Sequence, residues 1–229
     1  MKFVLLLLAC IVAIRAQNGR DCAVILPPAL DNFKTALGLD AGLTWQNAEA
    51  LSGAVYTKIT ASLNDFLSVC KCNFLCVMHV FYVFNEATFS ARQNFYSDLA
   101  RDYQLCVSHI TLYGLGGTTL ANTIVFEHLF RELEFECGPG FDVYVANQDC
   151  INQAELSDAQ STCYSTFNTT FHNDPNSICR ADGVQAYLDC SRAIFYTTCN
   201  NNLQVGWFQC ERERVAFAND CLNIQCKLI

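Results

Sequence analysis

Apolar residues recur three and four positions apart along most of the chain, which is the spacing of one face of an α-helix. The longest such stripe comprises Ala48, Leu51, Val55, Ile59, Leu63, Phe66 and Cys70. Thr44 precedes it at the N-cap position, where a hydroxyl accepts a hydrogen bond from the first helical turn. The pattern therefore predicts a helix that begins after Thr44 and buries this stripe.

Further helices are expected on both sides of this stripe. Pro27 and Pro28 open a short helix that ends at Gly38, and its buried face would comprise Leu30, Phe33 and Leu37. A helix capped by Ser90 would bury Phe95, Leu99, Cys106 and Ile110. A helix over residues 120–137 would bury Ile124, Leu129, Leu133 and Cys137. The glycine-rich segments 114–117 and 138–140 predict turns.

The remaining segments extend the helical pattern, with two exceptions. Helices are expected at residues 158–167, 183–198 and 203–221. Residues 141–146 alternate in polarity, which suits a short strand, although one isolated strand is marginally stable. Residues 72–84 are apolar on nearly every side, so a buried helix and a buried strand both remain open, and the helical flanks favour the helix.

The first 16 residues have the order of a secretory signal peptide, with Lys2, an apolar stretch and then Ala16. Removing them deletes Cys10, Lys2 and Arg15, which leaves 14 cysteines and a net charge of −10. A chain this acidic is not expected to bind nucleic acid or an anionic membrane through bulk charge. No second apolar run is long enough for a membrane anchor. We therefore expect a secreted, extracellular protein.

Cysteine is far more frequent than in ordinary proteins, and its count becomes even when the signal peptide is removed. The mature cysteines are Cys22, Cys70, Cys72, Cys76, Cys106, Cys137, Cys150, Cys163, Cys179, Cys190, Cys199, Cys210, Cys221 and Cys226. The alternative is a metal site at the C-x-C-x3-C segment of residues 70–76, but no second cluster has zinc-ligand spacing. In an oxidising compartment these cysteines predict disulfide bonds.

These patterns predict an all-α fold, a disulfide-laced helical bundle with one or two subdomains. The expected division is a signal peptide over 1–16, a cysteine-poor helical subdomain over 17–136 and a cysteine-dense helical subdomain over 137–229.

The histidines form no recognisable catalytic motif, since G-x-S-x-G and H-E-x-x-H are both missing. His79 lies in an apolar segment without the Cys-Cys-x-x-His-Asp order of a disulfide-rich phospholipase, so we interpret it as a packed core residue. His128 and Glu132 are four residues apart on an expected helix, and we interpret them as an ordinary surface pair. The other two histidines are His109 and His172. The sequence thus predicts no catalytic residue, metal ligand or cofactor.

Three other segments were weighed as sites. Residues 114–117 are rich in glycine but lack the Lys-Ser/Thr of a phosphate-binding loop. The acidic residues Glu127, Glu132, Glu134 and Glu136 lack the spacing of a calcium-binding loop, so we expect a solvated helix face. Asn168 begins the sequon Asn168-Thr169-Thr170, which predicts N-glycosylation if the chain is secreted.

The last third of the chain has a cadence of cysteines and aromatic residues, VQAYLDCSRAIFYTTC at 184–199 and GWFQCERERVAFANDCLNIQC at 206–226. This cadence resembles a set of nematode secreted proteins built on a cysteine-rich domain of unknown function. The resemblance implies an extracellular location and a helical disulfide fold. It brings no catalytic residue with it.

Three functions follow as hypotheses. The first is a secreted, non-enzymatic protein that binds an unknown extracellular protein, because a rigid, disulfide-held surface loses little freedom on binding. The second is a carrier of a small apolar ligand, which requires an apolar pocket of roughly 300 Å³ or more. The third is a hydrolase with non-contiguous residues, which requires a histidine and a carboxylate to converge beside a nucleophile or a metal.

Overall fold

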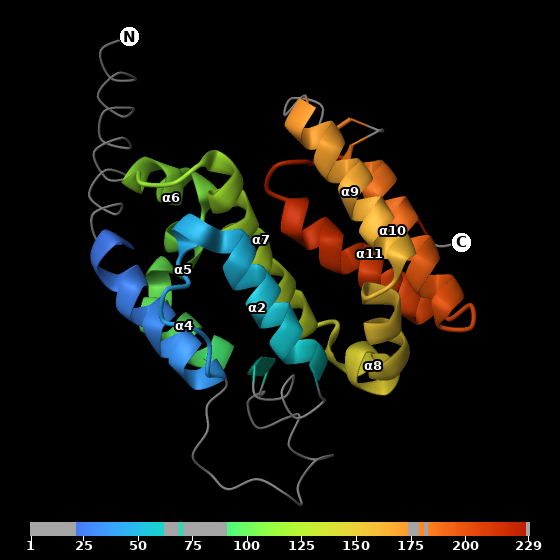
Figure 1. The fold of residues 1–229 in the computed structure, drawn as a ribbon, viewed down its shortest axis with the longest axis horizontal. Helices are drawn as coiled ribbons and strands as arrows, with labels where there is room; N and C mark the ends of the chain where they lie inside the picture. Colours follow the sequence, from blue (N-terminus) through green and yellow to red (C-terminus); the bar gives the residue numbers. More distant parts are fainter. Residues whose placement is uncertain (1–21, 62–68, 71–90, 174–178, 181–182, 228–229) are drawn as a thin grey trace, which may run out of the picture. The chain divides into compact units, whose positions relative to one another are not determined.

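The computed structural model describes residues 22–61, 69–70, 91–173, 179–180 and 183–227. Every regular element within these ranges is a helix, so the all-α prediction is confirmed. The chain divides into two compact units, Met1–Phe130 and Arg131–Ile229, and the division falls inside helix α7 (Leu120–Glu136) (Figure 1). The predictions for the signal peptide, Ser90, residues 72–84 and His79 lie outside the described residues.

The first unit contains a helix over residues 22–37 and a series of short helices. These are η1 (Trp45–Asn47), α2 (Ala48–Ala61), α4 (Ala91–Leu99), η3 (Ala100–Asp102), α5 (Tyr103–Cys106) and α6 (His109–Leu115), followed by the start of α7. Thr44 caps η1 and α2 as predicted, since its hydroxyl accepts from the Gln46 backbone N at 3.3 Å. Ala48, Leu51, Val55, Ile59 and Cys70 are all buried, so the predicted stripe is confirmed there; Leu63 and Phe66 lie outside the described residues.

Two expectations for the first unit are wrong. The helix predicted to begin at Pro27 already includes residues 22–26, so both prolines lie inside it, where each forgoes a backbone hydrogen bond. The disulfide of Cys22 with Cys106 fixes this earlier start. Ile110 is 67% exposed instead of buried, because Ala100, with φ +46°, ends the helix that was expected to continue to it.

Aromatic rings fill the core of the first unit. The Phe33 ring lies 5.7 Å from that of Phe95 and 5.4 Å from that of Phe130, and the last two stack at 4.2 Å between centroids. Of the residues predicted to face inward on α7, Leu129, Leu133 and Cys137 are buried but Ile124 is only half-buried. After α6 the predicted glycine turn is present, with φ +78° at Gly116 and +76° at Gly117.

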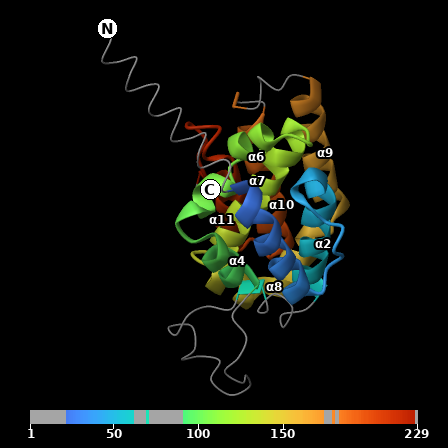
Figure 2. The same ribbon diagram turned by 90° about the vertical axis from the view of Figure 1, so that its left-hand side faces the viewer.

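The second unit contains the end of α7 and four helices, α8 (Phe141–Glu155), α9 (Asp158–Asn173), α10 (Val184–Thr198) and α11 (Leu203–Phe217). Helix α10 packs against α8, α9 and α11 (Figures 1 and 2). Apolar side chains of α9, α10 and α11 form one cluster, to which the segment after α11 adds Cys221 and Ile224.

Three expectations for the second unit need correction. The possible strand at residues 141–146 is the first part of α8, which buries Tyr144, Ile151 and Ala154 at helical spacing. Helix α9 extends six residues beyond the predicted end at Phe167. Helix α11 ends at Phe217 instead of Cys221, because the chain turns there to bring Cys221 to Cys179.

The predicted disulfide framework is confirmed. Cys150 bonds to Cys199 and Cys163 to Cys190, so α8 and α9 are each linked to the α10 region. The bonds Cys179–Cys221 and Cys210–Cys226 fix the segment that follows α11. Cys70 and Cys137 are also disulfide-bonded, and Cys72 and Cys76 lie outside the described residues.

Residues 218–227 form what we call the C-terminal strap, which runs beside α10. The Gln185 side chain both donates to the Gln225 carbonyl and accepts from the Gln225 N–H, each at 3.0 Å. Arg192 donates to the Lys227 carbonyl at 2.6 Å. Among the described helices, none combines the length and the apolar character that a membrane crossing requires.

Candidate functional site

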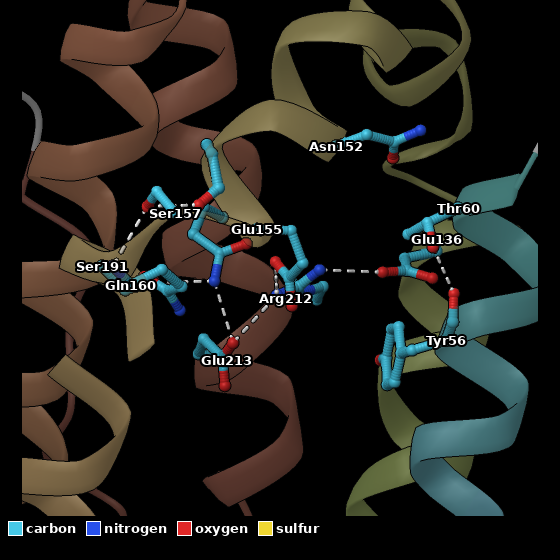
Figure 3. A network of polar contacts seen from close by, with 12 residues as sticks. Tyr56, Thr60, Glu136, Asn152, Glu155, Ser157, Gln160, Ser191, Arg212 and Glu213 are labelled. Atoms are coloured by element: carbon cyan, nitrogen blue, oxygen red, sulfur yellow. Dashed lines mark hydrogen bonds and ion pairs between the residues drawn. The ribbon is translucent and has the colours of Figure 1, made fainter. Parts of the chain in front are cut away.

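A cluster of polar side chains lies inside the second unit, and we call it the Arg212 cluster. It comprises Glu136, Glu155, Gln160, Ser191, Gln209, Arg212 and Glu213 (Figure 3). All of these residues are buried except Glu155, whose side chain is 25% exposed. Buried polar groups at this density require partners for nearly every donor and acceptor.

Helix geometry places these side chains together. The Asn202 side chain caps α11 by accepting from the Gln204 backbone N at 2.9 Å. Gln209 and Glu213 are four residues apart on that helix and therefore share a face. Glu136 is the last residue of α7 and Glu155 the last of α8, so both carboxylates reach Arg212 from helix ends.

The turn between α7 and α8 depends on a glycine. At Gly140, a Cβ would lie 2.7 Å from Cε1 of Phe135 and 2.8 Å from Cε2 of Phe208. A residue with a side chain would force these rings apart. The missing side chain therefore lets α8 begin close beside the end of α7 and beside α11.

Arg212 contacts three carboxylates. Its Nη1 lies 3.3 Å from Glu136 Oε1, and its Nη2 lies 3.0 Å from Glu155 Oε2 and 3.2 Å from Glu213 Oε1. The guanidinium carbon also lies 5.8 Å from the centre of the Phe195 ring, within reach of a cation–π interaction. One guanidinium thus joins α7, α8 and α11.

Neutral groups continue the network into α10 and α9. The Gln209 side-chain amide donates to Glu213 Oε1 at 2.9 Å and to Ser191 Oγ at 2.7 Å. The Ser191 hydroxyl donates in turn to Gln160 Oε1 at 3.0 Å. Because Ser191 is held between two amides and the cluster contains no histidine, this serine lacks the base that a nucleophile needs.

The charges of the cluster do not balance. One guanidinium faces three carboxylates, so full ionisation would leave two uncompensated negative charges in a buried place. Burial raises the pKa of Glu136 to about 7, and the nearby carboxylates of Glu155 and Glu213 act in the same direction against the opposing effect of Arg212. Burial likewise raises the pKa of Glu213. The arrangement therefore favours a bound proton.

The acidic run of α7 does not form the solvated face that we expected. Glu127 is 2% and Glu136 0% exposed, whereas Glu132 and Glu134 are half-buried. The two buried carboxylates are accommodated because each has a partner from a distant part of the chain. That of Glu136 is Arg212, and that of Glu127 is His109.

His109 and Glu127 form a second polar pair, in the first unit. Glu127 Oε2 lies 2.7 Å from His109 Nδ1 and accepts the His109 backbone N–H at 2.8 Å. A carboxylate in this position fixes the orientation of the imidazole. His128 is half-buried on α7 beside the half-buried Glu132, so neither is the exposed pair that we expected, and His172 lies on α9.

The described residues hold neither of two other kinds of site in developed form. No three His, Cys, Asp or Glu side chains in that part of the chain are grouped as metal ligands. A depression beside the C-terminal strap has room for only about 10 Å³, roughly one water molecule. It is lined by Arg192, Tyr196, Leu203, Gly206, Trp207, Cys226 and Lys227.

Comparisons of the chain with protein-family models, with curated proteins and with solved structures find no match. The functional interpretation therefore depends on the residues and their geometry.

Proposed function

We propose that the chain is a secreted, disulfide-stabilised protein that binds an extracellular partner through its surface and is not an enzyme. The observation that carries this proposal is the set of disulfides, which links α8, α9, α10 and the C-terminal strap into one covalent framework. Such bonds are typical of oxidising compartments. A framework of this kind presents a surface that loses little conformational entropy on binding.

The interior of the second unit supports a structural role for its polar groups. The side chains of the Arg212 cluster are occupied by one another across five helices. Recognition would then take place on exposed side chains. Large apolar ones that the structure exposes are Val24, Tyr96, Ile110, Tyr113, Leu120, Leu156, Tyr164, Leu203 and Leu222.

The experiment is to express the full chain in secreting cells and to probe an array of extracellular receptor domains with the protein from the medium. We expect saturable binding of the oxidised protein and loss of that binding after reduction. The same protein is analysed by native mass spectrometry and assayed against ester, phospholipid and peptide substrates. A bound apolar molecule at one per chain, or turnover of any substrate, would overturn the proposal.

The pair of His109 and Glu127 is the one observation that favours a second candidate, a hydrolase. Its geometry supplies a carboxylate-oriented imidazole, which is half of a general-base system. If the substrate assays show turnover, His109→Ala must abolish it while His128→Ala leaves it unchanged. Turnover that survives His109→Ala would exclude this pair as the active site.

We also propose that Asn168 carries an N-linked glycan. Asn168 lies on α9, where most of the neighbouring hydroxyl residues are exposed, among them Thr166 and Thr169. Asn168→Gln and Thr170→Ala should both remove a mass that a glycosidase also removes, while Thr169→Ala, at the unrestricted middle position of the sequon, should retain it. An unmodified Asn168 in the secreted protein would refute this proposal.

A further inference from the structure

The Arg212 cluster contains a carboxyl group that is poorly suited to carry a charge. Glu136 is 0% exposed, and one of its oxygens, Oε1, faces Arg212. Its other oxygen, Oε2, is buried and accepts no hydrogen bond within the described residues. An ionised oxygen in this position would lack the solvation that water provides, whereas a protonated one avoids that penalty.

The neighbouring groups act in the same direction. Helix α8 places Glu155 and Tyr144 near Glu136, and α11 adds Glu213 beside Arg212. Tyr187 of α10 hydrogen-bonds to Glu213, and burial raises the pKa of the Tyr187 hydroxyl well above its ordinary value. Both tyrosines therefore stay neutral, and Arg212 is the sole cation that these groups share.

We propose that the Arg212 cluster is a proton-binding regulatory site, in which Glu136 holds a proton under acidic conditions and releases it as the solution becomes neutral, which loosens the junction of α7, α8 and α11. Release requires a path to solvent. Glu155, which is partly exposed and contacts the same guanidinium, provides an acceptor at the edge of the cluster. The proton passes from the Glu136 carboxyl to water, and the cluster gains one negative charge.

The direction of the effect follows from linkage. The folded protein holds the Glu136 proton up to a pKa of about 7, whereas in the unfolded chain the pKa takes its ordinary value of 4.5. Between these values the folded state binds one more proton than the unfolded state, so stability falls as pH rises. The opening equilibrium should increase by up to about tenfold per pH unit in this window and become constant above it.

The test is hydrogen exchange of the full secreted protein between pH 4.5 and 8.5, corrected for the intrinsic pH dependence of exchange. Peptides from α8 and α11 are followed in the wild type, in Glu136→Gln and in Glu134→Gln. Glu134 is the matched control, since it lies on the same helix with 40% of its side chain exposed. We expect the wild type and Glu134→Gln to open more as pH rises, and Glu136→Gln to lose most of this dependence.

Two results would overturn the proposal. One is a wild-type protein whose α8 and α11 peptides open equally at pH 5 and pH 7.5. The other is a Glu136→Gln variant that retains the full pH dependence. If Glu136→Gln is not secreted, Glu155→Gln serves instead, because removing that negative charge should move the opening transition to lower pH; an unmoved transition would exclude the cluster as its origin.

Discussion

Replacement of Arg212 by methionine tests whether its guanidinium compensates the buried carboxylates. Methionine keeps an unbranched chain of similar length, so the main change is the loss of charge and of five N–H donors. Glu136, Glu155 and Glu213 would each lose a contact of 3.0–3.3 Å. Removing one member of a buried ion pair typically costs about 3–5 kcal/mol. We expect the free energy of unfolding of the second unit to fall by that amount at pH 8.

The measurement is urea denaturation followed by tryptophan fluorescence. Trp207 reports on α11, where its ring lies 5.8 Å from that of Phe135, and Trp45→Phe removes the signal of the other tryptophan. The control is Arg214→Met, on the same helix. Arg214 pairs with Glu211 at 2.7 Å but is 33% exposed, so its loss should cost less than about 1 kcal/mol.

The Arg212→Met variant should also change the pH dependence. Without the cation, the three carboxylates take up protons more readily in the folded state, so the destabilisation should be smaller at pH 5 than at pH 8. Equal destabilisation at both pH values, or a loss no greater than that of Arg214→Met, would refute the view that Arg212 is present to neutralise charge.

Three further predictions concern stability. Gly140→Ala should lower the stability of the second unit by about 1–3 kcal/mol, because the added Cβ meets two rings, while Gly53→Ala, in open space on α2, should raise that of the first unit by about 0.5–1 kcal/mol; thermal unfolding compares them, and equal effects would contradict the packing argument. Lys34→Met should cost the first unit about 1–3 kcal/mol in urea, since the ammonium donates to the carbonyls of Ala41 at 2.7 Å and Leu43 at 2.8 Å, and an unchanged midpoint would show that water replaces it. Replacing Cys22 and Cys106 by serine should cost about 4–5 kcal/mol and replacing Cys210 and Cys226 about 3 kcal/mol, because their sequence separations are 84 and 16; the reverse order would argue against a chain-entropy origin.

Local pattern predicted much of the fold because burial of one helix face leaves a mark at every third or fourth residue. The stripe of Ala48, Leu51, Val55 and Ile59 was recognised for this reason. The errors arose where a single backbone feature intervened. Ala100 adopts positive φ and redirects the chain before Ile110, and alanine carries no sequence signal for that conformation.

The candidate site was not predicted, because its members signal nothing individually. Glu136 was assigned to a solvated face, since a charged residue on a helix is usually exposed. Its burial depends on Arg212, which is 76 residues away. The same holds for Glu127, whose partner His109 precedes it by 18 residues. No helical periodicity relates such positions, so only the three-dimensional arrangement brings these pairs together.

The sharing of one guanidinium among three carboxylates restricts how this chain can evolve. A substitution that removes the cation at 212 leaves surplus negative charge inside the protein. Homologues that carry an apolar residue there should therefore also have replaced Glu136 or Glu213 by an uncharged residue. Substitutions at these sites are expected to accumulate as a group, and an alignment of orthologues would reveal them as covarying columns.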